Sequence, residues 1–182
     1  MRPAARRVAA RGSLTAKPGQ RYCERVLPLD VVGIRVDKAN NNPVVVLREV
    51  GGERFLPIWI GAVEATAIAY AQEKVEVPRP LTHDLFVAAL EALGHTLEEV
   101  RIVGLEDGVY FAELVFTGGA TVSARPSDAI ALALRSDARI VAAEEVLEHG
   151  GVGYPAEDEV VVEQFREFLD HVSPDDFEPG TR

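Results

Sequence analysis

The sequence predicts an α+β fold, with a mixed, mostly antiparallel sheet of hairpins and a meander packed by about four helices. Two observations lead to this prediction. Runs rich in β-branched residues follow one another in pairs, joined by short turns that contain Gly-Gly or Asp-Gly, which is the pattern of hairpins. Helical patterns separate these pairs irregularly, so the regular strand–helix–strand repeat of a parallel sheet is missing.

The first predicted strands lie near the N-terminus. A near-continuous apolar run predicts a strand over Val31–Val36. Two β-branched runs, Pro43–Val50 and Glu53–Ile60, flank Gly51-Gly52 and predict a hairpin. A helix is expected from Gly61 to about Glu73, because apolar side chains recur there on one stripe.

The sequence pattern in the middle of the chain predicts a second helix and then a meander. The helix is expected over His83–Leu93, with Thr82 as its N-cap and Gly94 as the residue that ends it. The meander has three β-branched runs, the first two joined by Asp-Gly and the last two by Gly-Gly: Val100–Glu106, Val109–Phe116 and Ala120–Ala124.

The third predicted helix carries Ala and Leu on every face and is therefore expected to be buried on every face. It runs to about Arg135. Pro126 suits its first turn, and Ser127 or Asp128 can accept hydrogen bonds from its free N–H groups. A short apolar run, a helical turn and an amphipathic helix follow at Ile140–Ala142, Glu144–Glu148 and Ala156–His171.

Length and composition predict one domain with short extensions. Residues 1–27 form a basic, unstructured extension, residues 28–173 the domain and residues 174–182 a tail. The extension is open to three interpretations: a disordered or misassigned start, an arm that contacts nucleic acid, or a targeting signal. The single cysteine excludes an internal disulfide framework and a cysteine-rich zinc site. No apolar run approaches the roughly 20 residues of a membrane span, so the cytoplasm is the expected location.

Charge is distributed unevenly. Residues 1–27 carry seven Arg or Lys and one Glu, a net charge of +6, whereas residues 28–182 carry 12 basic and 28 acidic side chains, a net charge of −16. A domain this acidic repels a polyanion unless divalent cations bridge its carboxylates to phosphate or its arginines gather in one cleft. Otherwise its ligand is not a nucleic acid.

Three separated motifs resemble one known family. They are Leu56–Gly61 with the following Glu64-Ala65, then Arg79–Asp84, then Ser123–Asp128. In this order they resemble the bifunctional nuclease domain family, over roughly Leu27 to Ser173. The resemblance implies nuclease activity on RNA and DNA, and hence a nucleic acid as substrate.

The motifs hold the candidate site residues. Hydrolysis of a phosphodiester needs an activated water and positive charge on the phosphate, which Mg²⁺ or Mn²⁺ held by carboxylates supplies. His83 is the candidate acceptor of the water's proton, and Arg79 and Arg125 are candidates to hold the phosphate. The candidate catalytic and metal-binding carboxylates are Glu64, Asp84 and Asp128.

Each candidate also has a structural interpretation. His83 and Asp84 suit the start of a helix, as does Glu64, because acidic side chains there are favoured by the helix dipole. Arg125 and Asp128 suit a pair that fixes a strand-to-helix turn. Trp59, the single tryptophan, fits the core or a subunit interface better than base stacking.

Two functions from different classes follow. The first is a nuclease that hydrolyses phosphodiester bonds in RNA or DNA with a divalent metal. The second is a non-enzymatic regulatory or assembly module that binds a protein partner. A homo-oligomer, most simply a dimer, is expected in either case, because the predicted elements have more apolar faces than one domain readily hides.

Overall fold

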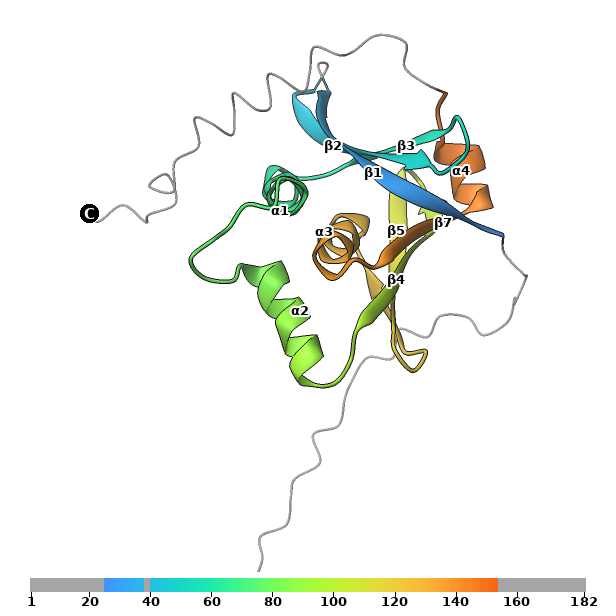
Figure 1. Ribbon diagram of the computed structural model, residues 1–182. Helices are drawn as coiled ribbons and strands as arrows, with labels where there is room; N and C mark the ends of the chain where they lie inside the picture. The colour runs from blue at the N-terminus through green and yellow to red at the C-terminus, as the bar shows by residue number, and fades with distance from the viewer. Residues whose placement is uncertain (1–24, 38–39, 154–182) are drawn as a thin grey trace, which may run out of the picture.

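The computed structural model describes residues 25–37 and 40–153. These residues form a seven-stranded sheet in the order β3-β2-β1-β7-β4-β5-β6, together with four helices. Neighbouring strands are antiparallel except β4 and β7, which are parallel. The predicted α+β fold, with its mixed and mostly antiparallel sheet, is confirmed (Figure 1).

The first three strands are β1 (Val26–Asp37), β2 (Asn42–Glu49) and β3 (Phe55–Trp59). The predicted hairpin between β2 and β3 is present. β1 begins five residues before the predicted Val31. Its first four residues pair with β7, at Ile140–Ala143, which lies more than a hundred residues away in the sequence.

The first two helices are α1 (Ala62–Gln72) and α2 (Thr82–Ala92). The prediction that Thr82 caps α2 is wrong, because the N-cap is Leu81. The Leu81 N–H instead donates to Asp84 Oδ2 at 2.8 Å, so the carboxylate three residues into the helix satisfies the backbone there.

Gly94 ends α2 as predicted. Its φ is +80°, a left-handed conformation that favours glycine. Its N–H donates to Glu91 O at 2.9 Å, and the N–H of His95 donates to Leu90 O at 3.0 Å. These two bonds form a Schellman motif, the commonest way for a helix to end on glycine.

The predicted meander comprises β4 (Leu97–Glu106), β5 (Val109–Phe116) and β6 (Thr121–Ala124). At the tight turn between the first two strands, Asp107 and Gly108 have φ of +49° and +80°. Positive φ at both central residues matches the twist of an antiparallel hairpin.

The buried helix α3 (Pro126–Ser136) opens with Pro126 as predicted, and residues 129–133 are all buried. No side chain caps its start, so the predicted capping by Ser127 or Asp128 is wrong. Asp128 is engaged by Arg125 instead. β7 (Arg139–Ala143) then enters the sheet between β1 and β4 and so joins the hairpin to the meander.

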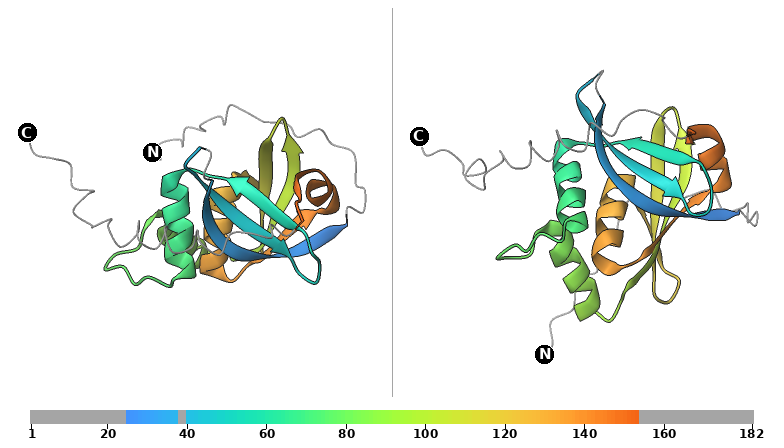
Figure 2. Two further views of the ribbon diagram at one scale, coloured as in Figure 1. Left: turned by 90° about the horizontal axis from the view of Figure 1, so that it is seen from above. Right: turned by 45° about the horizontal axis from the view of Figure 1, so that its top comes forward.

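The helices lie on both sides of the curved sheet. α1, α2 and α3 lie on one side, with α3 in the angle between the two halves of the sheet, and α4 (Glu144–Gly150) lies on the other (Figures 1 and 2). None of the described helices is long and apolar enough to cross a membrane. The predicted helix over Ala156–His171 lies outside the described residues.

Candidate active site

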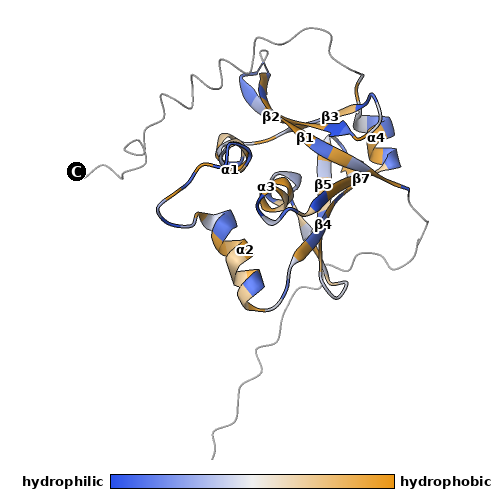
Figure 3. Cartoon of the chain, in the orientation of Figure 1, coloured by the Kyte–Doolittle hydropathy of each residue, from blue (hydrophilic) through white to orange (hydrophobic). Residues whose placement is uncertain are grey.

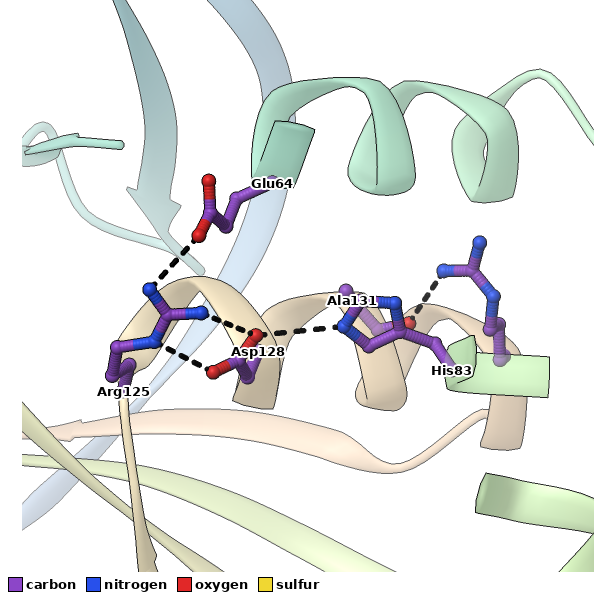
Figure 4. A network of polar contacts seen from close by, with 6 residues as sticks. Glu64, His83, Arg125, Asp128 and Ala131 are labelled. Carbon is purple, nitrogen blue, oxygen red and sulfur yellow. Dashed lines mark hydrogen bonds and ion pairs between the residues drawn. The ribbon is translucent and has the colours of Figure 1, made fainter. Parts of the chain in front are cut away.

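Arg125 lies between the end of β6 and the start of α3, where it is the N-cap residue. Its guanidinium donates two hydrogen bonds to Asp128, from Nε to Oδ2 at 2.8 Å and from Nη2 to Oδ1 at 3.1 Å. A third bond runs from Nη1 to Oε1 of Glu64, on α1, at 2.8 Å. One guanidinium therefore holds two carboxylates from different helices (Figure 4).

His83 extends this arrangement from α2. Its Nε2 lies 3.5 Å from Oδ1 of Asp128, an ion pair when the imidazole is protonated. Glu64, Arg125, Asp128 and His83 thus form a continuous chain of polar contacts, which we call the Arg125 cluster (Figure 4).

The fold brings the four residues together at the starts of three helices. Glu64, His83 and Asp128 all lie in the first turn of their helices, and both α1 and α2 pack on α3. The carboxylates lie where the positive end of a helix dipole stabilises negative charge. The packing of α1 and α2 on α3 sets the distances between these helix starts.

The Arg125 cluster is open to solvent. The side chains of Arg125, Asp128, Glu64 and His83 are 66%, 34%, 21% and 20% exposed. These groups can therefore meet a ligand from solution.

A pocket of about 440 Å³ lies beside the cluster. Glu64 and Arg125 line it, together with Trp59 and Tyr110. Burial raises the pKa of the Tyr110 phenol, so this hydroxyl stays protonated near neutral pH. The pocket therefore combines two aromatic rings with one charged pair.

Arg125 has N–H groups left that can donate hydrogen bonds to a ligand. Hydrogen bonds to Asp128 and then to Glu64 raise the pKa of its guanidinium, so the group is always charged. A guanidinium has five N–H groups. Three donate to the two carboxylates, and the other two donate to no described residue.

Asp84 lies apart from the cluster. It forms an ion pair with Arg135, near the end of α3, and lines a separate pocket of about 220 Å³. Burial by itself would raise the pKa of Asp84, but hydrogen bonds from Arg135 and from the Leu81 N–H lower it below its usual value. Arg79 is exposed and makes no hydrogen bond or ion pair with the described residues. Four of the six predicted site residues therefore come together.

The three candidate metal ligands do not form one ligand set in this arrangement. Glu64 and Asp128 both bind the Arg125 guanidinium, and Asp84 binds Arg135. Within residues 25–37 and 40–153, no three His, Cys, Asp or Glu side chains are grouped so as to hold a metal ion.

Sequence reasoning missed several features of the site. Trp59 is 57% exposed, which rules out the core as its place in this chain. Its position at the end of a strand, two residues before Gly61, was a usable signal. Arg135 was also missed as the partner of Asp84, although an arginine in an otherwise apolar helix needs a partner.

Comparison with known proteins assigns a family. A model of the bifunctional nuclease domain matches residues 45–154, more than half of the chain. The chain belongs to this family. The resemblance found in three sequence motifs is thereby confirmed, and the whole Arg125 cluster lies inside the matched bifunctional nuclease domain.

Two kinds of relative are similar in sequence. An uncharacterized protein of Mycobacterium tuberculosis, from two strains, is 53% identical over 156 residues, which are 81% of this chain and 95% of that protein. Small ribosomal subunit protein uS4 of a Mycobacterium species is 30% identical over 66 residues, 35% of this chain and 33% of that protein. The second match is too short to show a shared family.

Proposed function

We propose that this protein is a nuclease that hydrolyses phosphodiester bonds in RNA or DNA, with the Arg125 cluster as its active site. One observation supports this proposal most. An exposed, permanently charged guanidinium lies at the wall of a pocket with a carboxylate beside it. Membership of the bifunctional nuclease domain family supports the same reaction.

The chemistry begins with Arg125. Its two remaining N–H groups donate to oxygens of the phosphate, and this charge stabilises the additional negative charge of the transition state. Asp128 holds the other edge of the guanidinium and fixes its plane, and His83 in turn contacts Asp128. Asp128 and His83 are therefore positioning residues.

Glu64 is the general base in this mechanism, because it lines the pocket with Arg125 whereas His83 does not. Its carboxylate takes a proton from a water molecule, whose oxygen bonds to phosphorus as one ester P–O bond breaks. The leaving oxygen takes a proton from solvent, and Glu64 returns its own. One water is consumed, and the two products end in a phosphate monoester and a hydroxyl.

A second candidate function is favoured by the same contacts. Arg125 ties α1 to the start of α3, which is a structural task in itself. The described residues carry 10 basic and 19 acidic side chains, a net charge of −9, which suits a protein partner with basic groups better than a polyanion. A regulatory or assembly module would need no catalysis by these residues.

Digestion of labelled RNA and DNA by the purified full chain separates the two candidates. We predict that Glu64→Gln and Asp128→Asn each lower kcat by about a hundredfold or more, because the first removes the base and the second frees the guanidinium. His83→Ala is expected to lower kcat less, since it acts through Asp128. We expect each of the three variants to melt near the temperature of the unchanged protein.

The double variant Glu64→Gln/Asp128→Asn, purified in parallel, is the control for contaminating nucleases. Each digestion is run with Mg²⁺, with Mn²⁺ and with EDTA. The comparison tests the prediction that hydrolysis depends on a divalent metal. Equal digestion by the unchanged protein and the double variant contradicts the nuclease proposal. Loss of folding in every variant supports the structural role of the cluster.

A further inference from the structure

Trp59 is an unusual residue to leave exposed. It is the last residue of β3, and more than half of its surface is open to solvent. Its indole N–H donates to Oδ2 of Asp37, on β1, at 3.2 Å. The polar edge of the ring is therefore satisfied within the protein, and what remains for a ligand is the flat apolar face.

The pocket beside Trp59 has mixed chemistry and suitable size. Its volume of about 440 Å³ lies within the range of small-ligand sites. The indole of Trp59 and the ring of Tyr110 belong to one lining, and Arg125 and Glu64 belong to the same lining. A nucleotide presents the matching pair of groups, a flat base and an anionic phosphate.

We propose that this pocket binds one unpaired nucleotide of a single-stranded nucleic acid, with the base stacked on Trp59 and the adjoining phosphate at Arg125. The proposal rests on the proposed function and specifies its substrate class. Inside a duplex, both faces of a base are covered by neighbouring bases, so only the two end pairs offer a face to the indole. Single strands expose these faces, and stacking on aromatic side chains is how many proteins bind them.

Charge supports stacking as the main source of affinity. The Arg125 cluster holds two carboxylates for one guanidinium, and the described residues carry a net charge of −9. Few phosphates can be neutralised by such a surface. Binding is therefore expected to weaken with salt far less steeply than it does for proteins that contact many phosphates.

Fluorescence tests this site directly, because Trp59 is the single tryptophan of the chain. The probe is a short single-stranded DNA with a phosphorothioate backbone, which resists cleavage during the titration. We expect it to quench and shift the tryptophan emission of the full chain. A longer duplex that carries the same sequence in its interior, and an abasic strand with the same backbone, are expected to leave the emission nearly unchanged.

Variants give the second measurement, with affinity followed by anisotropy of the labelled single strand. Trp59→Ala is expected to weaken binding about tenfold or more, and Trp59→Phe to restore part of it. Phe111→Ala is the matched control, because Phe111 is also an exposed aromatic but lines neither pocket. It should bind as the unchanged protein does.

Three outcomes overturn the proposal: unchanged emission when anisotropy shows binding, equal affinity of Trp59→Ala, or equal quenching by the duplex. A change of oligomeric mass in Trp59→Ala, without a change of affinity, assigns Trp59 to a subunit interface and also overturns it. The nuclease proposal is separable from these results, since loss of digestion in Glu64→Gln does not depend on where the base binds.

Discussion

Arg125 and Arg135 lie at the two ends of α3, and each holds a carboxylate from another helix. Arg125 binds Glu64 of α1, and Arg135 binds Asp84 of α2. Their exposure differs sharply, since the Arg135 side chain is 9% exposed and that of Arg125 is 66% exposed. The enclosed Arg135 guanidinium favours a structural role for its pair, whereas the open Arg125 guanidinium remains accessible to a substrate.

This difference predicts a stability effect that depends on pH. Asp84→Ala leaves the part-buried Arg135 without its carboxylate, and we expect a loss of about 2 kcal/mol in the free energy of unfolding at pH 7. Because the pKa of Asp84 is lowered in the folded state, its contribution is fully present above the unfolded pKa of about 3.9 and is lost as the pH falls through the lower folded value.

Urea unfolding of the unchanged protein and of Asp84→Ala, at pH 7 and at strongly acidic pH, measures this effect. The difference between the two proteins should shrink at the acidic pH. Glu64→Gln is the comparison, and we expect it to cost less at pH 7. An equal loss for both variants would refute the division into a structural pair and an accessible pair.

At the scale of elements, local chemistry was predictable and distant pairing was not. Asp107-Gly108 and Gly94 were found from sequence, because each needs a positive φ that few residues adopt. The first half of β1 was missed, because Pro28 and Asp30 interrupt its apolar pattern and its pairing partner is β7. The contact between Glu64 and Arg125 likewise depends on how α1 packs on α3, and sequence periodicity does not report that.

The start of β1 sets a boundary for truncation. Composition predicts an extension of residues 1–27 that adds nothing to folding, but Val26 and Leu27 pair with β7 in β1. We therefore expect only the deletion of residues 1–24 to leave the melting temperature unchanged. Deleting residues 1–29 is expected to lower it by several degrees, since this removes the pairing of β1 with β7 and the buried Leu29. Calorimetry of the two truncated proteins checks both statements, and equal melting temperatures would contradict the second.

At the scale of the whole molecule, α2 is a helix that the rest of the described domain does not bury. It contains no buried residue and is apolar along most of its length (Figure 3). Leu81, Leu85 and Leu93 are 41–75% exposed, and at 3.6 residues per turn they span about 120° of the surface of α2 and its two capping residues. An apolar face of this kind is typical of a protein interface.

We predict that this face joins two copies of the chain, because a two-fold dimer is the commonest way to cover such a surface. Light scattering at micromolar concentration should give the mass of a dimer, and Leu85→Glu should give that of a monomer without loss of fold. A monomeric mass for the unchanged protein would contradict the prediction.

Arg125 is the central residue of the proposed active site, and Arg125→Lys tests its role most directly. Lysine keeps the positive charge but cannot hold Asp128 with two bonds while it also reaches Glu64 and a phosphate. The decisive measurement is the rate at which the variant digests single-stranded RNA, beside its melting temperature. We expect the rate to fall about a hundredfold or more while the melting temperature changes by only a few degrees. Digestion at the rate of the unchanged protein would contradict the claim that the Arg125 cluster is the active site.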